Sequence, residues 1–141
     1  MAIQDTVDGL KSDFELLQEP DAIMEYIFDM GKEHEGLPEE ERTDETYVDG
    51  CASEAWLVCD FEDGVMKFRG HGTSEMAKGM MEMLLKIFSN RTPDEILSFN
   101  PEELHKMGIV ELLSPVRQQS LEAFLKMVYG YAQKCKVQQE G

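Results

Sequence analysis

A single β-hairpin pattern between two long stretches of helical periodicity limits the folds that this chain can adopt. Residues Ala55–Phe61 and Val65–Arg69 have strand character, and the turn residues Glu62-Asp63-Gly64 join them. A two-stranded hairpin is not stable alone in water, so helices must cover it. The sequence therefore predicts an α+β fold in which a small antiparallel β-sheet packs against helices.

The two predicted strands differ in the pattern of their side chains. On the second strand, Lys67 and Arg69 alternate with apolar residues, which indicates one solvent-facing side. The first strand carries apolar residues on both faces, so we expect it to be covered on both sides. The residues before it, 33–49, are strongly acidic, and we expect them to form a solvated loop.

The remaining sequence has helical spacing. We expect two N-terminal helices, the first with Leu10, Phe14 and Leu17 inward and the second beginning at Pro20. The helical C-terminal half begins after Gly72 with a helix rich in methionine, which we expect to be buried on two sides. Later helices begin where a capping residue precedes proline, as at Thr92, Asn100 and Ser114. With no linker or repeat, residues 1–141 are expected to form a single domain.

Composition excludes several classes of function. The chain has 141 residues, of which 42% are hydrophobic, and its net charge is −16. Such a charge disfavours binding to nucleic acid or to an anionic membrane, whereas it permits a basic protein partner. The first residues do not resemble a secretory signal, and no apolar run reaches the length of a membrane span. Three cysteines, an odd number without close pairs, fit a reducing cytoplasm.

The residues that carry chemistry do not form a recognisable catalytic or metal-binding pattern. No nucleophile–base pair or glycine-rich phosphate loop is visible, and the three histidines are isolated in the sequence. A zinc site would have to draw on Cys51, Cys59, His71 and Cys135, although structural zinc usually takes ligands in close pairs. We therefore expect no metal, no cofactor and no autonomous catalysis. Cys59 is expected to be a small buried hydrophobe, and Cys135 an exposed thiol in a frayed tail, residues 132–141.

Cys51 is the cysteine with an unusual setting. It lies between Gly50 and Ala52, where the backbone can bend and another protein can approach closely. The neighbouring carboxylates of Asp49 and Glu54 disfavour a thiolate, which is the opposite of what an autonomous cysteine nucleophile needs. A thiol that only receives sulfur needs less activation, so this setting favours a carrier. We also expect Trp56, Leu57 and the methionine-rich helix to form an apolar recess that shelters the sulfur.

The same residues carry a resemblance to a known family. Gly50-Cys51-Ala52-Ser53 followed by Trp56-Leu57-Val58 resembles the G-C-x-S-x-x-W signature of the SufE family, sulfur acceptors for cysteine desulfurases in iron–sulfur cluster assembly. The likeness extends from about Phe14 to Ala132 and includes Leu113-Ser114-Pro115-x-Arg117. It departs from the family at Gly70-His71-Gly72-Thr73-Ser74, where a G-D-S-D segment is common, and at Gln119-Ser120, where Asn-Gly is common. Both departures bear on how the cysteine loop is held.

The resemblance implies a fold, a function and partners. The fold would be the SufE/IscU-like α+β fold, and Cys51 would accept persulfide sulfur from a SufS-type cysteine desulfurase. The sulfur would pass to an Fe–S scaffold such as the SufBCD complex. Arg117 would face the partner, and the residues that flank or support the loop would be Gly50, Ala52, Ser53 and Trp56. The protein itself would be a monomer or a weak dimer.

Two other functions are compatible with the same sequence. A cluster-binding or zinc-binding scaffold of the IscU-like fold would need three cysteines to converge with an acidic or histidine ligand. An activator of a desulfurase in another sulfur-transfer pathway would have the same residues as a SufE-type acceptor. Bound metal after purification would identify the scaffold, and neighbouring genes would separate the two acceptor pathways.

Overall fold

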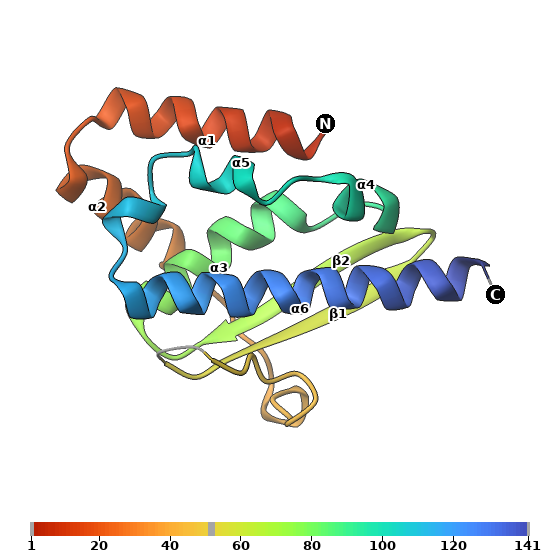
Figure 1. The fold of residues 1–141 in the computed structure, drawn as a ribbon. Helices are drawn as coiled ribbons and strands as arrows, with labels where there is room; N and C mark the ends of the chain where they lie inside the picture. The colour runs from red at the N-terminus through yellow and green to blue at the C-terminus, as the bar shows by residue number, and fades with distance from the viewer. Residues whose placement is uncertain (1, 51–52, 141) are drawn as a thin grey trace.

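The computed structural model of the chain describes residues 2–50 and 53–140 (Figure 1). Its architecture is α+β, with a two-stranded antiparallel sheet, so the predicted fold class is confirmed. Its regular elements, in chain order, are α1 (Ile3–Leu17), α2 (Pro20–Gly31), the 3-10 turn η1 (Glu39–Glu41), β1 (Ala55–Glu62), β2 (Val65–Gly72), α3 (Glu75–Phe88), α4 (Pro93–Ser98), α5 (Glu102–His105), the 3-10 turn η2 (Val110–Leu112) and α6 (Pro115–Glu140).

The hairpin forms as the turn signal predicts. β1 and β2 pair in antiparallel register from Ala55 opposite Gly72 to Glu62 opposite Val65. Asp63 and Gly64 both have positive φ, 54° and 78°, which suits the tight turn of a twisted hairpin. The two strands extend beyond the predicted ends by one residue on β1 and three on β2. Side chains alternate between a core face, with the fully buried Leu57 and Met66, and an outer face.

Two helices, α3 and α6, cover the core face of the hairpin. The methionine-rich α3 buries Met81 and Met83 together with Leu84, and it also packs against α2, which confirms that it is covered on two sides. Helix α6 runs along the whole hairpin (Figure 1). No helix in residues 2–50 or 53–140 is both long and apolar enough to cross a membrane.

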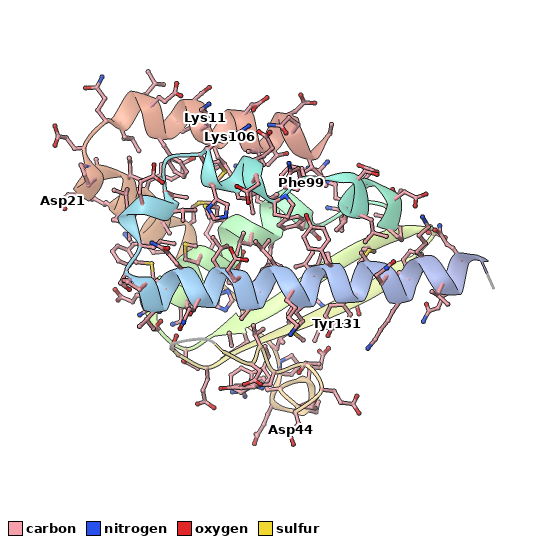
Figure 2. The ribbon with its side chains drawn as sticks, viewed as in Figure 1. Lys11, Asp21, Asp44, Phe99, Lys106 and Tyr131 are labelled. Carbon is pink, nitrogen blue, oxygen red and sulfur yellow. The ribbon has the colours of Figure 1, made fainter. Side chains whose placement is uncertain are left out.

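Helix α6 corrects the prediction for the C-terminal residues. Residues 132–140 are not a frayed tail, because the helix continues to Glu140. Val128, Ala132 and Cys135 are all buried, and their spacings of four and three place them on one face of the helix. Nearby on the same helix lies Tyr131 (Figure 2). Its hydroxyl donates a hydrogen bond of 2.7 Å to the carbonyl of Leu57 on β1. The end of α6 is therefore part of the core.

The acidic segment, residues 33–49, is also more ordered than a solvated loop. Most of its carboxylates are exposed, but Leu37 and Val48 are buried. On the outer face of the hairpin, Arg69 forms ion pairs with Asp60 of β1 and with Glu41 of the segment. The segment thus packs over part of the second face of β1, where Trp56, Val58 and Asp60 are half-buried and Glu62 is exposed, so β1 is covered on this side only in part.

Candidate functional site

The loop that contains Cys51 is closed at its base by backbone pairing. Tyr47 and Trp56 form an antiparallel bridge, in which Val48 N–H donates to Ala55 and Leu57 N–H donates to Thr46, both at 2.8 Å. The rings of Tyr47 and Trp56 meet edge to face, with centroids 5.7 Å apart. Cys51 and Ala52 lie outside the described residues, and the described part of the site consists of residues that flank them in the sequence.

Gly50, the residue before Cys51, lies against α6. Its φ of 100° is a conformation that residues with a side chain rarely adopt, so glycine is required by the local backbone. A methyl group added at this position would touch the side chain of Ala123 at 3.4 Å, an ordinary van der Waals distance. The sequence predicts a backbone that can bend at this position, and the positive φ of Gly50 agrees with that expectation.

On the other side of the cysteine, the chain is held at the start of α3. The hydroxyls of Ser53 and Ser74 are hydrogen bonded at 3.1 Å. Ser74 also caps α3, because its Oγ accepts the N–H of Ala77 at 3.0 Å. Both the backbone N–H and the hydroxyl of Thr73 donate to the carbonyl of Glu54. The sequence did not predict a role for Thr73 or Ser74. Their position just before an apolar helix could have indicated an N-terminal cap at Ser74.

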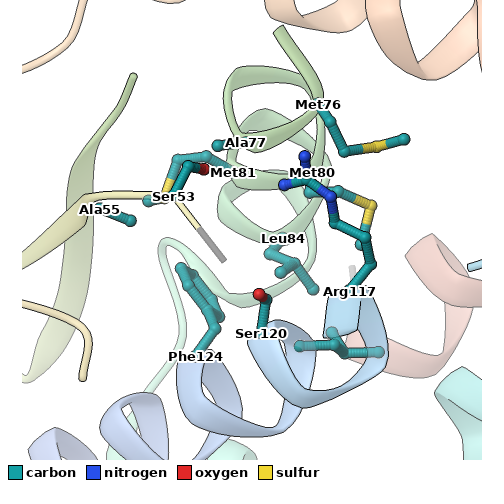
Figure 3. A pocket seen from close by; sticks show the side chains of 11 residues that line it. Ser53, Ala55, Met76, Ala77, Met80, Met81, Leu84, Arg117, Ser120 and Phe124 are labelled. Atoms are coloured by element: carbon teal, nitrogen blue, oxygen red, sulfur yellow. The ribbon is translucent and has the colours of Figure 1, made fainter. Parts of the chain in front are cut away.

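A small apolar pocket lies beside this loop, between α3 and α6 (Figure 3). Its volume of about 50 Å³ has room for roughly three or four water-sized groups, too little for an organic cofactor. The lining residues are mostly apolar and come from three parts of the chain: Ser53, Ala55, Met76, Ala77, Met80, Met81, Leu84, Arg117, Ser120, Leu121 and Phe124. A pocket of this size and polarity has room only for a small apolar group.

Arg117 supplies the one cationic side chain of the pocket lining. It lies in the first turn of α6, where its N–H donates to the Oγ of Ser114 at 3.3 Å. The half-buried side chain extends from α6 toward Met80 on α3 (Figure 3). Within residues 2–50 and 53–140, no carboxylate forms an ion pair with Arg117, although the surface of this chain is rich in acid. The guanidinium can therefore meet an anion at the pocket.

Trp56 and Leu57 do not line this pocket, so that part of the predicted recess is wrong. Strand alternation directs Ala55 and Leu57 to the core face, where Leu57 is fully buried, and turns Trp56 to the outer face. There the ring of Trp56 contacts Tyr47 and His71. The methionine-rich helix does line the pocket, as predicted, and α6 supplies the opposite wall. Trp56 belongs to the base of the loop instead.

The other two cysteines face each other away from the pocket, between β1 and α6. Cys59 is half-buried, Cys135 is buried, and their thiols interact by a hydrogen bond. Burial, together with the neighbouring Cys135, raises the pKa of Cys59 to about 12, and burial also raises the pKa of Cys135. Cys135 is therefore not the exposed thiol that its position near the C-terminus suggested. Neither thiol is poised to react.

The described part of the chain does not assemble a metal centre. Outside residues 1, 51–52 and 141, no group of three or more His, Cys, Asp and Glu side chains is arranged to hold a metal ion. Of the zinc ligands considered from the sequence, Cys59 and Cys135 lie together, whereas His71 is on the outer face of the hairpin, in contact with Trp56.

Comparisons with known proteins identify likenesses in sequence and fold. Residues 8–132 match the family described as "SufE: Fe-S metabolism associated domain". An uncharacterized SufE-like protein of Rhizobium meliloti (strain 1021) is 31% identical over 133 residues, covering 91% of this chain and 95% of the relative. Another from Rhizobium etli is 32% identical over 128 residues, covering 87% and 86%. The solution structure of a hypothetical protein from Thermus thermophilus has a TM-score of 0.72 at 20% identity, covering 91% of this chain and 96% of that one, which shows the shared fold alone.

Proposed function

The chain belongs to the SufE family, associated with Fe–S metabolism, and on this premise we propose that it accepts sulfur from a cysteine desulfurase on Cys51. The observation that carries the proposal is the setting of this residue. The sequence puts Cys51 midway along a loop that is bridged at its base, and the described ends of the loop contact α6 and the start of α3 beside an apolar pocket.

The proposed transfer is an exchange between a thiol and a persulfide. The thiolate of Cys51 attacks the outer sulfur of the persulfide on the desulfurase cysteine. A new S–S bond forms on Cys51, the S–S bond of the donor breaks, and the donor cysteine leaves as a thiolate. No external oxidant or reductant is needed, because the outer sulfur keeps its oxidation state. The desulfurase releases the sulfur from cysteine, so the exchange proposed for this chain requires no cofactor of its own.

The described residues support each requirement of this exchange. The backbone of Gly50 is exposed and has no side chain, so a donor cysteine can approach closely. The guanidinium of Arg117 favours the anionic sulfur that enters or leaves. The apolar pocket can exclude water and small thiols from a stored persulfide until the acceptor is met. Ala52 and Ser53 complete the flanks of the loop, and Trp56 fixes its base.

The proposed partners follow from the same family. A SufS-type desulfurase would deliver the sulfur in the cytoplasm, and an Fe–S scaffold such as the SufBCD complex would receive it. The exposed surface of this chain is strongly acidic, with 29 Asp and Glu residues against 13 Lys and Arg. A basic surface around the desulfurase active site would therefore increase the rate of association.

Intact-mass analysis tests the proposal. The protein is incubated with a SufS-type desulfurase and cysteine, and the expected product carries the mass of one added sulfur that a reductant removes. Peptide mapping should find this sulfur on Cys51, and Cys51→Ser should abolish both sulfur acceptance and stimulation of the desulfurase. Because the flanking residues are small, Cys51→Ser should unfold at the temperature of the native protein.

Cys59→Ala is the matched control, since it also removes one thiol but leaves the loop intact. It should accept sulfur as the native protein does. Full stimulation by a folded Cys51→Ser protein would disprove the assignment. Zinc or iron that co-purifies with the native protein in stoichiometric amount would instead identify a scaffold.

A further inference from the structure

Two histidines connect the acidic segment to the hairpin, and neither is used by the proposed sulfur transfer. His71 projects from the outer face of β2, where its Nδ1 accepts the backbone N–H of Leu37 at 2.9 Å. Its ring also meets Trp56, with centroids 5.7 Å apart. The backbone of Gly36, with φ of 75°, approaches the imidazole so closely that a Cβ at this position would collide with Nδ1. The segment is thus packed directly on this ring.

His34 makes the reciprocal contact. It lies in the segment, and its Nε2 accepts the backbone N–H of Gly72 on β2 at 3.1 Å. Its Nδ1 lies 3.0 Å from Oε1 of Glu82 on α3, and only 3% of the His34 side chain is exposed. The two imidazole rings are 5.9 Å apart. Each histidine therefore holds a backbone N–H of the other's part of the chain.

Both contacts require an unprotonated ring nitrogen. A backbone N–H can only donate, so Nδ1 of His71 and Nε2 of His34 must each present a lone pair. Protonation of either ring puts a second N–H in front of the backbone donor, and the hydrogen bond is lost. We propose that His34 and His71 form a pH-sensitive latch that fastens the acidic segment to β2, closed when both rings are neutral and released when they are protonated.

The charges around the latch set the direction of its response. Burial lowers the pKa of His71, and the nearby charges of Arg42, His34 and Lys78 lower it further. The groups that face His34 are mixed in sign: Glu82 at its Nδ1, and Lys32, Glu75 and Lys78 around the adjoining surface pocket. A lowered pKa in the folded state means that the unfolded state binds protons first. The contribution of His71 to stability is therefore complete above pH ~6.5 and is lost as the pH falls through its lowered pKa.

Release of the latch would affect the cysteine loop directly. The acidic segment ends at Asp49, and the next residues are Gly50 and Cys51. Its other attachments to the hairpin include the bridge between Tyr47 and Trp56, the buried side chain of Val48 and the ion pair between Glu41 and Arg69. Acidification would therefore loosen the chain on the N-terminal side of the loop, whereas the attachment of Ser53 to α3 does not titrate. This inference stands on the two hydrogen bonds and does not depend on the proposed sulfur transfer.

The two backbone N–H groups that the histidines accept are direct reporters of the latch. Amide hydrogen exchange of Leu37 and Gly72 can be followed by NMR from about pH 7.5 to about pH 5, across the range in which histidine titrates. After correction for the intrinsic dependence of exchange on pH, protection of both amides should fall by about tenfold, the change expected for loss of about one net hydrogen bond at each site. The amide of Val128, in the buried middle of α6, should keep its protection and serves as the internal control.

Non-titrating substitutions separate protonation from a merely structural role. In His71→Asn, the amide oxygen can accept at the position of Nδ1, and in His34→Gln it can accept at the position of Nε2. The double variant should keep both amides protected at neutral pH and lose the dependence on pH. His105→Asn is the matched control, because His105 contacts neither the segment nor β2 through any hydrogen bond of the described chain, and its pH dependence should equal that of the native protein.

The native protein alone can overturn the proposal, even if the double variant does not fold. The imidazole resonances of His34 and His71 report their titration in the same samples. Protection of Leu37 and Gly72 that stays constant while both rings titrate would refute the latch, and so would a folded double variant that loosens with acidification as the native protein does.

Discussion

The hydroxyl of Tyr131 fills a gap in the backbone pairing at the base of the cysteine loop. Leu57 N–H donates to Thr46, but the N–H of Thr46 turns back to the carbonyl of Thr43, so it does not return the bond to Leu57. The carbonyl of Leu57 accepts from Tyr131 of α6 instead, at 2.7 Å. Because Leu57 is fully buried, Tyr131→Phe leaves a carbonyl without this partner in the interior.

The loss of stability in Tyr131→Phe can be estimated from the kind of group that is left unpaired, a buried backbone carbonyl. One net hydrogen bond contributes about 1 kcal/mol, and a buried acceptor without a partner costs about 1–3 kcal/mol. The aromatic ring, which contacts Phe68 with centroids 6.2 Å apart, is retained by phenylalanine, so little packing energy is lost. We expect the free energy of unfolding to fall by about 1–2 kcal/mol, which lowers the Tm of a chain of this length by about 3–7 °C.

Thermal and urea unfolding, followed by circular dichroism, measure this loss. Tyr47→Phe is the matched control, because it deletes the same atom from the same region, and the hydroxyl of Tyr47 makes no hydrogen bond within the described residues. The control should change the Tm by no more than about 1–2 °C, the range of a neutral substitution. Equal effects of the two substitutions would refute the role assigned to Tyr131 at the base of the loop.

Two further predictions concern the other cysteines and the pocket. Cys59→Ala should lower the free energy of unfolding by about 1 kcal/mol, because it leaves a small gap in the core. Cys135→Ser should lower it by about 1–3 kcal/mol, because it buries a hydroxyl group. Sulfur acceptance should be unchanged in both variants. Denaturation curves and the intact-mass assay check this, and loss of sulfur acceptance in a folded Cys135→Ser protein would contradict it. Arg117→Gln should slow sulfur acceptance about tenfold, the effect of one charged hydrogen bond of about 1.5 kcal/mol, whereas Arg117→Lys should retain much of the rate. Initial rates of persulfide formation decide this, and an unchanged rate in Arg117→Gln would show that the guanidinium does not meet the sulfur.

The features that the sequence predicted are those with a local cause. The turn at Asp63 and Gly64 needs residues that accept positive φ, and it formed where predicted. The cap at Thr92 is likewise local, with reciprocal bonds of 3.2 and 3.3 Å between Thr92 and Glu95. The burial of Cys135 could also have been predicted from helical spacing, because Cys135 continues the inward-facing positions of Val128 and Ala132. Its nearness to the C-terminus led to the wrong prediction of an exposed thiol.

Other features depend on contacts between distant parts of the chain and had no local signal. Arg117 and Ser53 line one pocket only because α6 lies beside α3, and no periodicity specifies that arrangement. The composition of the acidic segment predicts a solvated loop because charged residues outnumber its few apolar residues. Two buried apolar residues, Leu37 and Val48, nevertheless attach it, together with the two histidine contacts, the bridge at Tyr47 and the ion pair of Glu41. His71 stands where the family commonly has G-D-S-D, and its role became visible only through Leu37, which is 34 positions away.

On both outer edges of the hairpin, some of the backbone groups are already paired with other segments of the same chain. Residues around Tyr47 pair with β1 next to the cysteine loop, and Asn90 and Arg91 pair with Met66 of β2 near the opposite end. At these positions the backbone groups are already used, so a partner cannot add a strand there. If the loop binds a partner as proposed, recognition beside these positions would rely on side chains and shape instead of backbone hydrogen bonds. Partner choice in such a protein can change through single surface substitutions while the sheet remains intact.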